Sequence, residues 1–82
     1  MLKATVIVTL KQEVSDPQGF AVFEALRSMR MRGVQSVRVG KQFEVKLGGL
    51  TRAEAEKELH EVSAKLLSNP VIEDYRFEIT EA

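Results

Sequence analysis

The sequence predicts an α+β fold in which a four-stranded antiparallel sheet carries two helices on one face. Three observations support this prediction: strand-like segments with alternating apolar residues, two capped segments with helical spacing, and the order β-α-β-β-α-β. This order is that of the ferredoxin-like, split βαβ arrangement. The chain of 82 residues is expected to form one domain, residues 1–82, because a chain of this length has room for a single core.

The first strand and the first helix are predicted over residues 2–10 and 17–32. The strand is indicated by alternating apolar residues on one face, namely Leu2, Ala4, Val6, Val8 and Leu10. Asp16 is a preferred N-cap residue, and Pro17 falls at the first helical position, where its missing N–H costs nothing. Gly33 is expected to end this helix, because glycine readily adopts the left-handed conformation found there.

The middle of the chain is predicted to form a β-hairpin. Residues 34–39 and 42–48 contain alternating β-formers and are interpreted as its two strands. Gly40 and Lys41 lie between them and are expected to form the tight turn.

A second helix and a last strand are predicted in the final third of the chain. Thr51 with Glu54 three residues later has the pattern of a capping box, so the helix is expected to begin there. Asn69 and Pro70 should end it. Residues 71–79 alternate in polarity and are expected to form the last strand.

The composition excludes several classes of function. The chain has no cysteine and a single histidine, so neither a disulfide, a thiolate nucleophile nor a His-based metal site is expected. His60 is interpreted as a surface or boundary residue of the second helix. No apolar run approaches the roughly 20 residues that span a bilayer, so we expect a cytoplasmic protein without a membrane partner.

The distribution of charge indicates self-association or docking to a charged protein. The net charge is zero, but residues 1–41 carry seven basic and three acidic side chains, whereas residues 42–82 carry five and nine. The zero net charge and the lack of RNA-binding aromatic motifs argue against a nucleic-acid partner. Ile7 and Ile72 are expected on the uncovered face of the sheet, where an apolar patch would mark an interface between copies.

Several motifs in a fixed order give the chain a family resemblance. They are LK at 10–11, DPQG at 16–19, GKQFE at 40–44 and NPVIEDYRFE at 69–78. Together they resemble the small-subunit (PurS) family of phosphoribosylformylglycinamidine synthase, a glutamine-dependent ligase of purine biosynthesis. The resemblance spans nearly the whole chain.

The resemblance implies a non-catalytic adaptor that bridges a glutaminase subunit and an ATP-dependent synthetase subunit for ammonia transfer. It implies a homodimer or homotetramer that is inactive alone and binds no cofactor itself, while the complex uses ATP, Mg²⁺ and glutamine. The residues implied for partner or oligomer interfaces are Lys11, Asp16, Pro17, Gln18, Gly19, Arg38, Lys41, Glu44, Asn69, Glu73, Asp74 and Arg76. The alternative from the residues alone is an ACT-like regulatory module that binds a small molecule.

Overall fold

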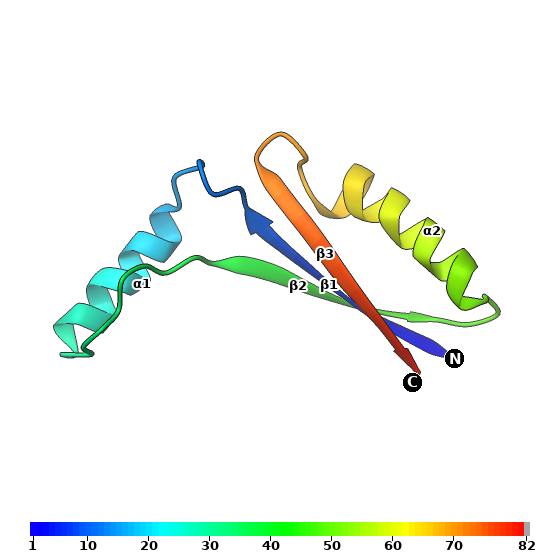
Figure 1. The fold of residues 1–82 in the computed structure, drawn as a ribbon, viewed down its shortest axis with the longest axis horizontal. Helices are drawn as coiled ribbons and strands as arrows, with labels where there is room; N and C mark the ends of the chain where they lie inside the picture. The colour runs from blue at the N-terminus through cyan, green and yellow to red at the C-terminus, as the bar shows by residue number, and fades with distance from the viewer. Residues whose placement is uncertain (82) are drawn as a thin grey trace.

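A three-stranded antiparallel sheet lies at the centre of the computed structural model, which describes residues 1–81 (Figure 1). Its strands are β1 (Leu2–Leu10), β2 (Gly40–Leu47) and β3 (Glu73–Glu81), and β1 lies between the other two. The first strand has the predicted bounds, whereas the last begins and ends two residues later than predicted. Both outer strands are antiparallel to β1.

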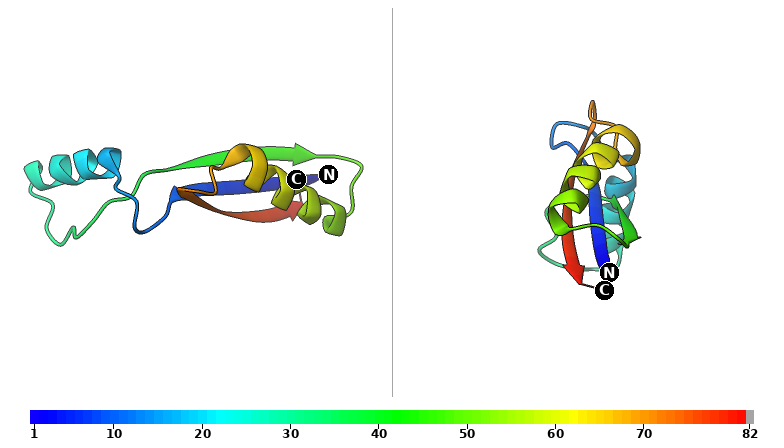
Figure 2. Two further views of the ribbon diagram at one scale, coloured as in Figure 1. Left: turned by 90° about the horizontal axis from the view of Figure 1, so that it is seen from above. Right: turned by 90° about the vertical axis from the view of Figure 1, so that its right-hand side faces the viewer.

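The core lies on one face of this sheet, beneath α2 (Arg52–Val62) (Figure 2). Its buried apolar side chains are Leu2, Ala4, Val6, Val8, Ala55, Leu59 and Ile79. The predicted capping box begins α2: the backbone N–H of Glu54 donates to Thr51 Oγ1 at 3.2 Å, and the N–H of Thr51 donates to Glu54 Oε1 at 2.8 Å. The helix continues into a wider π turn, Ser63–Leu67, before the chain turns back into β3.

The opposite face of the sheet is polar: Ile7 lies on this face as predicted, but it forms no apolar patch there with Ile72. Ile7 is half-buried, and its partners on the neighbouring strands are Gln42 and Arg76. Ile72 lies in the turn before β3. The other positions on this face are polar or charged, including Lys3, Thr5, Glu44, Lys46, Asp74 and Glu78. A sheet face of this composition can remain in water.

The predicted fourth strand and its hairpin are also wrong. Residues 34–39 form no strand, and the expected turn residues Gly40 and Lys41 pair with β1 as the first residues of β2. Val39 follows the register opposite Leu10, but its N–H donates to Asp16 Oδ2 instead. Residues 34–38 lie beyond the end of β1 and have no strand to pair with. The fold within residues 1–81 is therefore a three-stranded sheet and not the four-stranded ferredoxin-like sheet.

The helix α1 (Pro17–Ser28) projects beyond the end of the sheet instead of covering it (Figures 1 and 2). We call α1 and the segment that returns from it, residues 17–37, the arm. The molecule measures 49 × 28 × 15 Å, and its radius of gyration is 16.1 Å. A compact chain of this length would have a radius of gyration of about 12 Å. Only one of the two helices therefore lies over the sheet, contrary to the prediction.

The end of α1 also differs from the prediction. The helix ends at Ser28, and Arg30, with φ of 63°, takes the left-handed position that completes it. Gly33 also has a positive φ, of 83°, but lies beyond the end of the helix. The last turn is thus completed three residues earlier than glycine would have indicated. Neither helix of residues 1–81 has the length and apolar character needed to cross a membrane.

Two leucines of the second helical segment provide a matched test of where the core lies. Leu59 is 2% exposed, whereas Leu66 is 78% exposed. We expect Leu59→Ala to lower the free energy of unfolding by about 2–5 kcal/mol, because it removes buried methyl groups and leaves a cavity. Leu66→Ala should change it by less than about 0.5 kcal/mol. Urea unfolding followed by circular dichroism measures both, and equal losses would contradict this description of the core.

Candidate functional site

Most of the residues that carry the family resemblance gather where the arm meets the sheet. At this place β1 ends, while β2, β3 and α1 begin. We call it the junction and define it by Lys11, Asp16, Pro17, Gln18, Gly19, Arg38, Lys41, Asn69, Glu73 and Asp74. Glu44 and Arg76, the other two predicted site residues, lie further along the sheet.

Asp16 joins the start of the arm to its end. Its Oδ1 atom accepts a hydrogen bond from the backbone N–H of Gly19 at 2.8 Å, as an N-cap residue does. Its Oδ2 atom accepts a hydrogen bond from the N–H of Val39 at 2.8 Å. The Val39 and Gly19 N–H groups, and to a lesser extent the charge of Arg38, hold the pKa of the Asp16 carboxyl below its ordinary value. This carboxylate thus closes the base of the arm as an ionised acceptor.

Gly19 allows the two segments of the arm to approach each other closely. A Cβ atom at this position would overlap the carbonyl oxygen of Val37 and would lie 2.9 Å from Asp16 Oδ2. Pro17 occupies the first turn of α1, as predicted, while Gln18 is exposed beside Lys41. The DPQG motif therefore has a structural basis in the cap and in this close approach.

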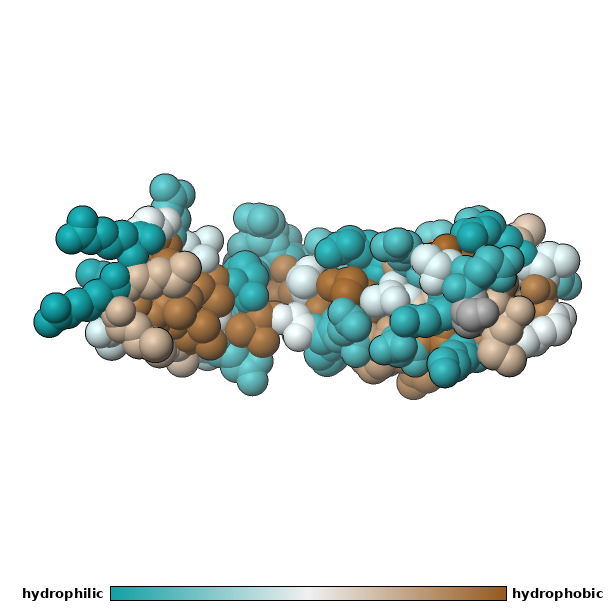
Figure 3. Space-filling model, turned by 90° about the horizontal axis from the view of Figure 1, so that it is seen from below, coloured by the Kyte–Doolittle hydropathy of each residue, from teal (hydrophilic) through white to brown (hydrophobic). Residues whose placement is uncertain are grey.

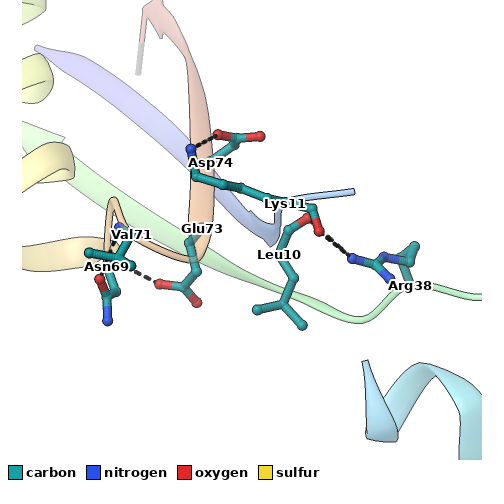
Figure 4. A network of polar contacts seen from close by, with 7 residues as sticks. All are labelled: Leu10, Lys11, Arg38, Asn69, Val71, Glu73 and Asp74. Atoms are coloured by element: carbon teal, nitrogen blue, oxygen red, sulfur yellow. Dashed lines mark hydrogen bonds and ion pairs between the residues drawn. The ribbon is translucent and has the colours of Figure 1, made fainter. Parts of the chain in front are cut away.

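Arg38 holds the end of β1 against the returning segment (Figure 4). Its Nη2 atom donates to the carbonyl oxygens of Lys11 at 2.7 Å and Val14 at 3.0 Å, with a longer contact to Leu10 at 3.5 Å. Lys11 and Val14 lie beyond the last paired residue of β1, and the Lys11 carbonyl also accepts a hydrogen bond from the N–H of Val14 at 3.0 Å. The guanidinium group therefore acts within the chain as a clamp on the junction.

A second set of contacts fastens the start of β3 to the same place (Figure 4). Lys11 Nζ lies 3.5 Å from Asp74 Oδ1, and Lys41 Nζ lies 3.5 Å from Glu73 Oε2. The other oxygen of Glu73 accepts from the backbone N–H of Asn69 at 2.7 Å. Such partly exposed ion pairs contribute about 0–1 kcal/mol each to the free energy of unfolding, so they add little to the stability of the junction.

Glu44 and Arg76 lie outside the junction. Glu44 pairs with Lys3 at 3.2 Å on the polar face of the sheet. Arg76 lines a cleft of about 420 Å³ together with Glu56, His60, Tyr75 and Phe77. The sequence motifs alone indicated Glu44 and Arg76 as site residues. The structure places both of them apart from the ten residues of the junction.

His60 contributes to an aromatic cluster that the sequence did not predict. Its Nδ1 atom lies 3.1 Å from the hydroxyl of Tyr75, and its ring meets that of Phe77 edge to face at 4.7 Å. The only available signal was the alternation that places Tyr75 and Phe77 on one face of β3. Among residues 1–81, no group of three or more His, Asp or Glu side chains is placed to hold a metal ion.

Comparison with known proteins gives consistent matches along the chain. A family model described as PurS, phosphoribosylformylglycinamidine (FGAM) synthase, matches residues 3–81. The phosphoribosylformylglycinamidine synthase subunit PurS of Bacillus subtilis (strain 168) is 47% identical over 85 residues, which cover 99% of this chain and 95% of the relative.

Solved structures match the arm as well as the sheet. PurS of Methanocaldococcus jannaschii superposes with a TM-score of 0.88 at 33% identity, covering 100% of this chain and 99% of that one. A chain in the structure of PurLQS from Thermotoga maritima gives a TM-score of 0.84 at 26% identity, covering 98% and 99%. Scores this high over almost the full length require the arm to project in the same direction in each protein.

The close approach at Gly19 can be tested against a glycine without such a contact. Gly19→Ala should lower the free energy of unfolding by about 1–3 kcal/mol, because the added Cβ must displace the backbone of the returning segment. Gly48→Ala is the control, since its nearest neighbour would be the end of the Met1 side chain at 3.9 Å. Urea unfolding of both variants makes the comparison, and a Gly19→Ala protein as stable as the control would contradict the packing described.

Asp16 should also make stability depend on acid. Its pKa in the folded chain lies below the ordinary value of 3.8, so its contribution is complete above that value and is lost as the pH falls through the folded pKa. Asp16→Asn removes this dependence and loses one acceptor, since the amide NH₂ cannot accept from an N–H group. Unfolding curves from about pH 5 to pH 2.5 should therefore converge in acid, whereas parallel curves would contradict the assignment.

Proposed function

The chain belongs to the PurS family of phosphoribosylformylglycinamidine synthase, and we propose that it serves that enzyme as a non-catalytic adaptor subunit. Its named relatives are subunits of this synthase, and the Methanocaldococcus jannaschii relative is one of the subunits of formylglycinamide ribonucleotide amidotransferase in the purine biosynthetic pathway. The observation that carries the proposal is the arm, a fastened apolar projection also present in the PurLQS chain. Exposed apolar surface of this kind is typical of a protein that binds other proteins.

The adaptor role gives this arm a use in the reaction. We propose that the chain bridges a glutaminase subunit, which releases ammonia from glutamine, and an ATP-dependent synthetase subunit, which consumes it. Ammonia that escapes into water takes up a proton and stops being a nucleophile, so the two active sites must be held together. In this proposal the larger subunits bind ATP, Mg²⁺ and glutamine, and the present chain supplies only contacts.

Self-association is the second part of the proposal, because the arm is not stable as a free element. Its 12-residue helix has no sheet beneath it, and isolated helices of this length are marginal in water. Apolar side chains are exposed along it, including Phe20 at 63% and Met29 at 77% (Figure 3). A homodimer or homotetramer in which copies cover one another's arms would bury this surface. The predicted sheet-face interface is replaced by the arm.

The ACT-like alternative loses its structural basis. It rested on a four-stranded sheet with both helices on one face, whereas residues 1–81 form three strands and leave α1 beyond the sheet. No observation in the structure favours a small-molecule site over the adaptor role.

The proposal predicts that the chain is required for glutamine-dependent activity but not for ammonia-dependent activity. Purified glutaminase and synthetase subunits, mixed with this chain, glutamine and Mg-ADP, should form a complex in sedimentation velocity. Phe20→Ser should weaken its assembly about tenfold or more, as truncation of a buried aromatic anchor does. The rate of glutamine-dependent amidination should fall in parallel. The rate with an ammonium salt as the nitrogen source should stay the same.

Leu66→Ser is the matched control, because Leu66 is an apolar residue that is even more exposed than Phe20 and lies outside the arm. It should assemble and support glutamine-dependent activity like the unchanged chain. A mixture that uses glutamine equally well without the chain would disprove the adaptor role. If the chain on its own sediments only as a monomer, the proposed self-association is disproved.

A further inference from the structure

The end of α1 is built around a residue that is poorly suited to its backbone conformation. The N–H of Met31 donates to the carbonyl of Leu26 at 3.1 Å, and the N–H of Arg30 donates to that of Arg27 at 2.9 Å. This pair of bonds defines a Schellman motif, whose left-handed position is usually glycine. Here that position is Arg30, with φ of 63°. Left-handed backbone is unfavourable for an arginine, because its Cβ crowds the neighbouring carbonyl oxygen.

Nothing within the described chain compensates for this conformation. The side chain of Arg30 makes no hydrogen bond or ion pair with residues 1–81, and neither does that of Arg32. Met29 and Met31 beside them are 77% and 55% exposed. The tip of the arm, residues 29–32, therefore presents two unpaired cations that alternate with two flexible apolar side chains. Residues held in sparsely populated backbone conformations cluster at functional sites.

The arm and the rest of the chain carry net charges of opposite sign. The arm, residues 17–37, holds three basic and one acidic residue, which gives +2 and leaves −2 for the remaining residues. Three carboxylates on the side of the sheet that α2 covers make no ion pair within residues 1–81, namely Glu56 and Glu58 on α2 and Glu81 at the end of β3. The tip and α2 lie at opposite ends of a molecule 49 Å long (Figure 1). The tip therefore cannot reach these carboxylates in its own chain.

We propose that Arg30 determines self-association by placing its guanidinium group on the acidic α2–β3 surface of a second copy. This rests on the proposed homo-oligomer and names the contact that selects it. The arginine stem and the two methionines supply apolar contact, and the guanidinium supplies charge that opposes the partner's carboxylates. In this arrangement the unfavourable backbone conformation at the helix end is offset by the contact that the Arg30 cation makes with the second copy.

The decisive variant is Arg30→Gly, because it should improve the helix end while removing the contact. In sedimentation equilibrium we expect the dissociation constant between copies to rise about fivefold or more. Urea unfolding over a series of protein concentrations separates subunit stability from association, and the variant subunit should be at least as stable as the unchanged one. A merely structural role for Arg30 would not produce these opposite effects.

Two further variants complete the experiment. Arg30→Lys keeps the charge and should retain most of the affinity, while Lys46→Gln removes one positive charge from the polar sheet face and should leave affinity unchanged. Raising the salt concentration should weaken the association between copies more for the unchanged chain than for Arg30→Gly. An unaltered dissociation constant for Arg30→Gly, or an equal loss for Lys46→Gln, would overturn the proposal. So would a variant that self-associates normally but fails to bind the larger subunits, since the tip would then contact those subunits.

Discussion

The course of the whole chain depends on the two oxygens of the Asp16 carboxylate. One accepts from Gly19 in the first turn of α1, and the other accepts from Val39, 23 residues later, just before β2. A single side chain thereby sets where the arm leaves the sheet and where it returns. Aspartate suits this place because it is short and acceptor-only, so both N–H groups are satisfied without a long flexible side chain.

This fastening divides the chain into a part that buries a core and a part that does not. The sheet and α2 enclose the buried apolar side chains, whereas α1 contributes only Gly19 to the buried set. A chain of 82 residues has little apolar surface to spare, and placing about a quarter of the chain outside the core lowers the stability of the isolated subunit. The arm is therefore understandable as a surface to be covered on assembly, not as a misplaced part of the fold.

Local signals predicted the features that local interactions decide. Asp16 and Thr51 cap helices as their sequence contexts indicated, because a cap involves only the next three residues. The valines of residues 34–39 favoured a strand, but pairing depends on where β1 ends, which no local pattern reports. The site follows the same rule. The motifs identified Arg38 as important, yet its carbonyl partners lie 24 to 28 residues away, so its role as a clamp could not be predicted.

The position of the motifs at the junction explains how these residues could control assembly through the direction of the arm. A projection whose direction is fixed during folding loses less conformational entropy on binding than a flexible one, so the same contacts give higher affinity. Two solved relatives at only 33% and 26% identity keep the arm in the same direction, which indicates that the direction itself is a shared property. If the chain holds two larger subunits for ammonia transfer, the distance between their active sites depends on this angle. The Asp16 and Arg38 contacts would then set the geometry of the complex from within the smallest subunit.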